Sequence, residues 1–167
     1  MLARPFVKWV GGKTQLLEEV ERSLPKNLSS ISNLVYVEPF VGGGAVLFWI
    51  LQKYPNISKA IINDINKELV CTYRVIRNDV ESLISELEII QNEYISLDES
   101  SRKTYYLNKR KLFNSKAITE LQTASLFIFL NRTCFNGLYR VNSKGEFNVP
   151  HGRYSNPRIC DMENLRA

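Results

Sequence analysis

The sequence predicts an α/β fold in which a parallel, doubly wound sheet is followed by an inserted helical region and a β-hairpin. Two short apolar runs, at 34–37 and 60–62, are each followed by a helical pattern, and this alternation is typical of parallel sheets. From Asn78 to about residue 130 only helical patterns appear. The 167 residues, 44% of them hydrophobic, fit one globular domain or one domain that carries an insertion.

The first elements are expected before residue 25. Residues 6–9 resemble a short strand that ends at Gly11 and Gly12. Apolar residues then recur at helical spacing over 16–24, and Pro25 ends this predicted helix.

Two strand-helix units follow. The strand at 34–37 leads through a glycine-rich loop into a helix over 45–52. The strand at 60–62 leads past Asp64 into a helix over 67–77. We expect the two strands to be parallel neighbours, because each is followed by a helix that returns the chain to the same edge of the sheet.

The remaining elements are predicted to be three helices and a hairpin. Helices are expected over 80–94, 105–113 and 118–130, and strands over 138–141 and 146–149. The hairpin turn at 142–145 ends in a glycine. The predicted regions are therefore 1–77 for the N-terminal part of the α/β core, 78–156 for the insertion and 157–167 for the start of the return to the core.

Composition favours an anionic partner. The formal net charge is +5, and basic residues concentrate after Arg102. No apolar run approaches the ~20 residues of a membrane span and no signal-peptide pattern is present, so a cytoplasmic protein is expected. The three cysteines are widely spaced, which suggests neither a disulfide framework nor a zinc site, and no metal is expected.

The segment from Glu38 to Gly44 predicts a cofactor pocket. A strand, a glycine loop, a helix and an acid about 20 residues further on, here Asp64, suit a nucleoside with ribose hydroxyls. Glu38 would repel a pyrophosphate but suits an ammonium group, which favours S-adenosylmethionine over a dinucleotide. Lys13 is a candidate partner for the carboxylate of such a ligand. The alternatives are an ordinary strand-helix turn and a solvated helix lysine.

A second block, over 131–140 and 147–154, is dense in Asn, Arg and aromatic residues. Arg can bind guanine O6 and N7, Asn can pair with adenine edges or phosphates, and aromatic side chains can wedge between bases. The block therefore predicts nucleic-acid recognition. The alternative is a polar hairpin with aromatic side chains in the core.

These residues resemble the Dam-type DNA adenine-N6 methyltransferases, which act on GATC, and the resemblance covers nearly the whole chain. The matching segments are the cofactor motif Phe6–Lys13, the glycine loop Glu38–Gly44, the turn Asn63–Asn66 and the recognition hairpin over 131–154. The resemblance implies a Rossmann-like core with an incomplete sheet, S-adenosylmethionine as cofactor and double-stranded DNA as partner. It implies that the cofactor is bound by Trp9, Gly11, Gly12, Lys13, Glu38, Phe40, Gly42, Gly44 and Asp64.

The resemblance also implies DNA contacts. Arg140 would read a guanine with help from Lys8, Leu138 and Pro150, and Phe135 would be a wedge. The family often has tyrosine at this wedge position, so a polar contact of its hydroxyl is in question here. The other expected DNA-binding residues are Asn131, Arg132, Asn136, Asn148, Arg153 and Tyr154.

The catalytic Asp-Pro-Pro-Tyr tetrapeptide of the family is absent from the chain, so no catalytic residue is assigned. We expect the 167 residues alone to be inactive. We also expect a homodimer through the exposed edge of the incomplete sheet. The alternative function is a non-enzymatic DNA-binding module with a vestigial cofactor loop. A nucleotide-dependent oxidoreductase is disfavoured by Glu38 and by the absent third glycine of the dinucleotide fingerprint.

Overall fold

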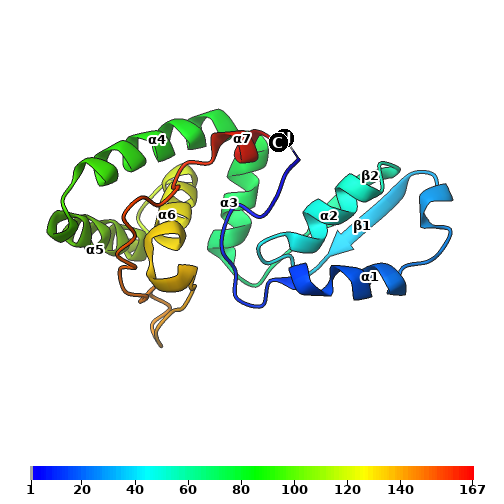
Figure 1. The fold of residues 1–167 in the computed structure, drawn as a ribbon, viewed down its shortest axis with the longest axis horizontal. Helices are drawn as coiled ribbons and strands as arrows, with labels where there is room; N and C mark the ends of the chain where they lie inside the picture. The colour runs from blue at the N-terminus through cyan, green and yellow to red at the C-terminus, as the bar shows by residue number, and fades with distance from the viewer. Residues whose placement is uncertain (1) are drawn as a thin grey trace.

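The computed structural model describes residues 2–167, which form a sheet lobe and a helical lobe, with α3 of the helical lobe nearest the sheet lobe (Figure 1). The sheet lobe contains α1 (Leu17–Ser23), β1 (Leu34–Glu38), α2 (Ala45–Lys53) and β2 (Ile57–Ile62). The helical lobe contains α3 (Lys67–Asn78), α4 (Val80–Ser96), α5 (Glu99–Ser115), α6 (Glu120–Thr133) and α7 (Met162–Arg166). Three short 3-10 helices occupy Lys13–Leu16, Leu28–Ser30 and Phe135–Gly137.

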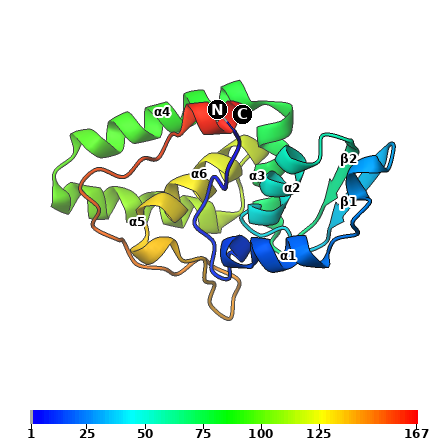
Figure 2. The same ribbon diagram turned by 45° about the vertical axis from the view of Figure 1, so that its right-hand side comes forward.

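β1 and β2 form a parallel pair, with Tyr36 opposite Ala60 and Glu38 opposite Ile62. The predicted parallel arrangement is confirmed for these two strands, and β2 begins three residues earlier than the apolar run indicates. α2 runs alongside the pair (Figure 2). Within residues 2–167 the sheet has only these two strands, and it leaves Val35, Val37 and Ile61 between 44% and 56% exposed.

α6 is the central helix of the helical lobe. Its residues from Ala124 to Asn131 are all buried, as expected for a helix that is apolar on every side and lies inside a core. It packs against α3, α4 and α5. A capping box fixes its start, since the Thr119 side chain accepts a hydrogen bond from the Gln122 backbone and the Gln122 side chain accepts one from the Thr119 backbone.

The predicted helices are confirmed, with changes at their ends. α5 begins at Glu99 instead of residue 105, because Asp98 caps the helix by accepting hydrogen bonds from the backbone and hydroxyl of Ser101. The first predicted helix is present as a 3-10 turn followed by α1, and none of its residues is buried. α7 was not predicted.

The predicted strand at 6–9 is wrong. This segment bends instead, because its backbone groups pair with side chains of α6 and not with another strand. Asn131 binds both the N–H and the C=O of Lys8, and Arg132 donates to the carbonyl of Phe6. Phe6 and Val7 are nevertheless buried in the helical core, so the N-terminal segment joins the two lobes.

The predicted hairpin is present in short form, without regular strands over 138–141 and 146–149. Gly145 donates to the carbonyl of Asn142 in the turn. The Asn142 N–H donates to Glu146 and the Asn148 N–H donates to Arg140, so that one antiparallel bridge joins Val141 to Phe147. The side chain of Asn114 in α5 also pairs with both the N–H and the C=O of Phe147. The segment is therefore a short hairpin loop held on a helix.

α7 joins the two ends of the described chain, which lie side by side (Figure 1). The Asn164 side chain pairs with the backbone N–H and C=O of Arg4, and Asp161 pairs with the Arg4 guanidinium at 3.1 Å. None of the helices over residues 2–167 has the length and apolar character that crossing a membrane requires.

Candidate cofactor pocket and nucleic-acid interface

The glycine loop between β1 and α2 lies directly against Trp9. Gly42 has φ +52°, and a Cβ atom built there would lie 2.9 Å from the Trp9 indole, so only glycine fits without movement of the ring. The Gly42 N–H donates to Asp64 Oδ2 at 2.9 Å. The loop is therefore fixed between the N-terminal segment and the start of α3.

A pocket of about 360 Å³ opens at this loop, within the size range of small-molecule sites. Seven of the nine predicted cofactor residues line it: Trp9, Gly11, Gly12, Lys13, Phe40, Gly42 and Asp64. The other two are not among its lining residues. Glu38 is bound to Lys13, and Gly44 precedes α2 with φ +84°.

Lys13, which lines the pocket, is paired with the carboxylate of Glu38. Lys13 Nζ lies 3.0 Å from Glu38 Oε1 and 2.7 Å from the carbonyl oxygen of Phe40. Glu38 is only 6% exposed, and its second carboxylate oxygen accepts a hydrogen bond from the Tyr36 hydroxyl at 2.8 Å. Burial and this carboxylate raise the pKa of Tyr36, so the hydroxyl stays a donor. An ammonium next to a carboxylate matches the charges of a zwitterionic amino acid.

Asp64 and exposed apolar side chains also line the pocket. Asp64 Oδ1 accepts a hydrogen bond from the Asn66 N–H at 3.0 Å, so both of its oxygens are oriented. Ile65, Phe40 and Val10 are 92%, 72% and 67% exposed, and all three line the pocket. Exposed apolar surface of this kind suits a flat ring. Ile65 and Val10 were not among the predicted cofactor residues. The position of Ile65 directly after Asp64 could have indicated that it lines the pocket.

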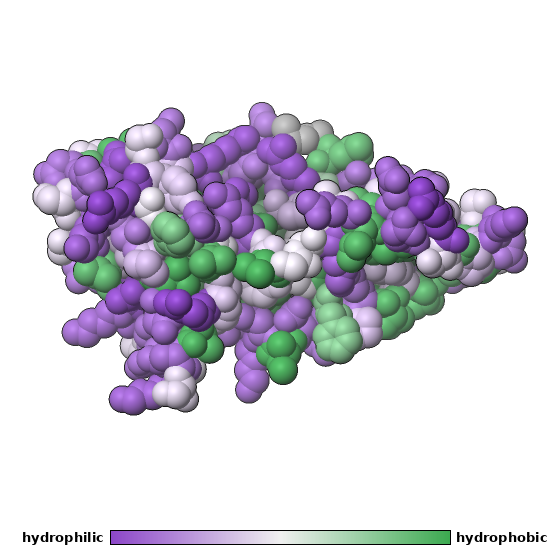
Figure 3. Space-filling model, turned by 60° about the horizontal axis from the view of Figure 1, so that its bottom comes forward, coloured by the Kyte–Doolittle hydropathy of each residue, from purple (hydrophilic) through white to green (hydrophobic). Residues whose placement is uncertain are grey.

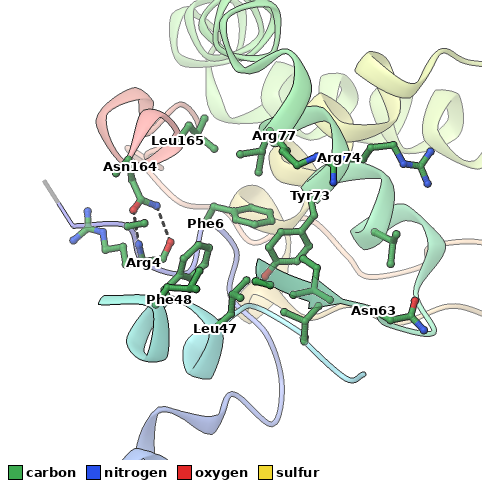
Figure 4. A pocket seen from close by; sticks show the side chains of 18 residues that line it. Arg4, Phe6, Leu47, Phe48, Asn63, Tyr73, Arg74, Arg77, Asn164 and Leu165 are labelled. Atoms are coloured by element: carbon green, nitrogen blue, oxygen red, sulfur yellow. Dashed lines mark hydrogen bonds between the residues drawn. The ribbon is translucent and has the colours of Figure 1, made fainter. Parts of the chain in front are cut away.

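A larger cavity, of about 400 Å³, is lined by residues of the N-terminal segment, α2 and α3 (Figure 4). Its floor is mainly apolar and includes Phe6, Leu47 and Phe48, while Arg74 and Arg77 lie at its edge. It contains no ion pair like that of Lys13 and Glu38. The predicted cofactor residues therefore point to the smaller pocket as the candidate site.

Ten of the eleven predicted DNA-binding residues are exposed or half-buried, the exception being Asn131. Nine of these ten, all but Arg132, are grouped here as the predicted recognition surface, and side-chain contacts join two pairs of them. Lys8 Nζ lies 5.0 Å from the centre of the Tyr154 ring, and Arg140 Nε donates to Asn148 Oδ1 at 2.8 Å. The face that contains the 140–147 loop carries a patchy band of apolar side chains between hydrophilic ones (Figure 3). The recognition surface is made of Lys8, Phe135, Asn136, Leu138, Arg140, Asn148, Pro150, Arg153 and Tyr154.

The other two predicted DNA-binding residues point inward. Asn131 is 2% exposed, and its side chain is bound to the backbone of Lys8 and to the carbonyl of Gly137. Arg132 donates to Phe6 and has a buried Nε without a partner among the described residues. Both side chains hold the N-terminal segment against α6.

Trp9 lines the pocket and also contacts the segment that precedes Arg140 of the recognition surface. Its indole lies close to Gly42, and the ring stacks on Tyr139 with centroids 5.6 Å apart and an interplanar angle of 28°. Tyr139 is adjacent to Arg140 in the chain.

His151, the only histidine, has a structural contact. Its Nε2 lies 2.7 Å from the Tyr94 hydroxyl, and burial together with Arg153 lowers its pKa. Among residues 2–167, no group of three His, Cys, Asp or Glu side chains is arranged to hold a metal ion.

Comparison with known proteins identifies relatives over nearly the whole chain. The family model for D12 class N6 adenine-specific DNA methyltransferases matches residues 9–167. The Type II methyltransferase M.MjaIII of Methanocaldococcus jannaschii is 54% identical over 99% of this chain and 58% of its own length. The Type II methyltransferase M1.LlaDCHI of Lactococcus lactis is 41% identical over 98% and 53%, respectively. The DNA adenine methylase of Escherichia coli is 35% identical over 96% and 51%. The chain thus spans little more than half the length of these relatives.

Proposed function

Because the chain belongs to the D12 class of N6 adenine-specific DNA methyltransferases, we propose that it forms the cofactor pocket and recognition surface of an enzyme that methylates adenine N6 in double-stranded DNA. The observation that carries the proposal is the position of Trp9, which lines the pocket at the glycine loop and stacks on Tyr139. A methyl donor and a DNA target must meet in one site, and Trp9 connects the candidate pocket to the residue that precedes Arg140 of the recognition surface.

The pocket suits S-adenosylmethionine, which supplies an activated methyl group when bound. Glu38 would bind the ammonium and Lys13 the carboxylate of its amino-acid part, while Asp64 would accept hydrogen bonds from the ribose. Phe40 and Ile65 would cover the adenine ring. The side chains of Glu38, Lys13 and Asp64 are already oriented by hydrogen bonds, and those of Phe40 and Ile65 line the pocket.

The recognition surface suits a GATC duplex. Arg140 would bind a guanine edge, supported by Lys8, Leu138 and Pro150, and Phe135, which is 52% exposed, would wedge between bases. Arg153 and Tyr154 would hold the backbone or the base left without its partner. Asn131 and Arg132 would contribute indirectly, by positioning the segments that carry these side chains.

We further propose that the 167 residues do not transfer methyl groups alone. Adenine N6 is a poor nucleophile, so the base must be flipped and its amino group must donate hydrogen bonds to the enzyme. The sequence contains no Asp-Pro-Pro-Tyr segment to accept them.

Calorimetry with S-adenosylhomocysteine and fluorescence anisotropy with a GATC duplex test the proposal. We expect the chain to bind both, and to bind the GATC duplex more tightly than one with a replaced guanine. Salt-dependent DNA binding without S-adenosylhomocysteine binding would instead support a non-enzymatic DNA-binding module. Transfer of a tritiated methyl group to DNA by these residues would contradict the proposed lack of activity.

A homodimer is the last part of the proposal. The parallel pair β1 and β2 has no further strand beside it within residues 2–167, and an unpaired edge with exposed valines favours association. A second copy of the chain is the proposed partner at this edge.

A further inference from the structure

Tyr73 is a half-buried tyrosine of α3 that lines the larger cavity (Figure 4). Its hydroxyl donates to the carbonyl oxygen of Gly42 at 3.0 Å. The ring is held by an edge-on contact with Phe6, at 4.9 Å between centroids. We propose that Tyr73 is a positioning residue for the cofactor loop, an inference that rests on the proposed function of that loop.

The peptide between Gly42 and Gly43 shows how the positioning would work. The C=O and N–H of a trans peptide point in opposite directions. Because Tyr73 binds the Gly42 carbonyl from the side of the larger cavity, the Gly43 N–H points away from Tyr73, toward the cofactor pocket that Gly43 lines. This N–H has no protein partner among the described residues, so it remains free to donate to a ligand.

Both backbone groups of Gly42, its N–H and its C=O, are bound by residues in or just before α3. Asp64, just before α3, accepts from the Gly42 N–H, and Tyr73, within α3, donates to the Gly42 C=O. A Cβ atom built on Gly44 would lie 2.5 Å from the Tyr73 hydroxyl, so that hydroxyl occupies the space beside Gly44. α3 thus sets the conformation of the loop.

Burial and the nearby carboxylates of Glu38 and Asp64 raise the pKa of Tyr73. The hydroxyl therefore stays protonated at neutral pH and remains a donor to Gly42. None of the contacts described for the cofactor pocket itself involves Tyr73, since it does not line that pocket.

The variant Tyr73→Phe removes the hydroxyl and keeps the ring. Tyr106→Phe is a matched control, because the Tyr106 hydroxyl also donates to a backbone carbonyl, that of Val149, at 2.8 Å. Two measurements apply to both variants of the 167-residue chain: amide hydrogen exchange over residues 38–48, and calorimetric affinity for S-adenosylhomocysteine.

We expect Tyr73→Phe to speed exchange at Gly42 and Gly44 and to weaken S-adenosylhomocysteine binding about three- to tenfold, the range for one lost hydrogen bond. Tyr106→Phe should change neither. Unchanged exchange in Tyr73→Phe, or equal losses in both variants, would overturn the inference. If the unmodified chain binds no S-adenosylhomocysteine, the proposed function fails, and the exchange data alone decide whether Tyr73 holds the loop.

Discussion

At the scale of single residues, Glu38 carries the most specific part of the cofactor proposal. It is a buried carboxylate whose two oxygens are bound by Lys13 and by the Tyr36 hydroxyl. An amino-acid ligand can use this site because its ammonium would face the carboxylate and its carboxylate would face Lys13. A dinucleotide offers no matching cation.

We expect Glu38→Gln to weaken S-adenosylhomocysteine binding roughly tenfold or more, since hydrogen bonds to charged groups contribute about 1.5–3 kcal/mol. Isothermal titration calorimetry measures the change. Glu18→Gln is the control, because the Glu18 side chain is 87% exposed on α1 and away from the pocket. Equal affinities for the Glu38→Gln variant and the unmodified chain would show that Glu38 does not meet the ligand.

Arg140 is the residue expected to carry target specificity. Its guanidinium is exposed and oriented by Asn148, which leaves the remaining N–H groups free to face a base edge. We expect Arg140→Ala to reduce the preference for GATC over a guanine-replaced duplex by about 1–3 kcal/mol. Anisotropy titrations at one salt concentration give both affinities.

Arg77→Ala serves as the control for this change, because Arg77 is exposed on α3 beside the larger cavity (Figure 4). If Arg140→Ala weakens binding to both duplexes equally, Arg140 contacts the phosphate backbone and does not read the base.

At the scale of elements, patterns in the sequence predicted the segments whose backbone hydrogen bonds lie within a helix or between two strands. The strand at 34–37 and the helices of both lobes follow from apolar spacing and from caps such as Asp98 and Thr119. The prediction of a strand at 6–9 was wrong, because the backbone of this segment is hydrogen-bonded to the side chains of Asn131 and Arg132, far along the chain. Spacing contains no signal for such pairing.

The candidate site divides in the same way. The residues of the glycine loop and Asp64 were predictable, because strand, loop and acid are close in the sequence. The stacking of Trp9 on Tyr139 was not predictable, since the two residues are far apart in the sequence and meet beside Phe127 of α6. That Asn131 and Arg132 point inward, away from the recognition surface, could not be predicted either, because composition does not reveal which way a side chain points.

The Asn131 side chain links α6 to the N-terminal segment and to the 3-10 helix at Phe135–Gly137, and its removal should weaken both contacts. We expect Asn131→Ala to lower the free energy of unfolding by about 2–3 kcal/mol, because the backbone N–H and C=O of Lys8 and the carbonyl of Gly137 would lose a buried partner. Urea unfolding followed by circular dichroism measures this. Asn78→Ala, at the exposed end of α3, should change the free energy by less than about 0.5 kcal/mol. Similar values for both variants would contradict the role of Asn131.

At the scale of the whole molecule, the two lobes differ in how well their apolar surface is covered. The helical lobe buries α6 from Ala124 to Asn131, and the N-terminal segment contributes Phe6 and Val7 to the same core. The sheet lobe leaves Val35, Val37 and Ile61 exposed on one pair of strands. A two-stranded sheet of this size is marginal in water unless further surface covers it.

Self-association through the sheet lobe is therefore the expected behaviour of the chain. Multi-angle light scattering over a range of concentrations should show a mass that rises from monomer toward dimer. Val37→Lys should shift this equilibrium toward monomer, because a charge at a position that is 56% exposed opposes burial against a second copy. Val141→Lys is the matched control, since Val141 is 43% exposed but lies in the loop held on α5. A constant monomer mass for the unmodified chain, or an equal effect of both variants, would place any association elsewhere than at β1 and β2.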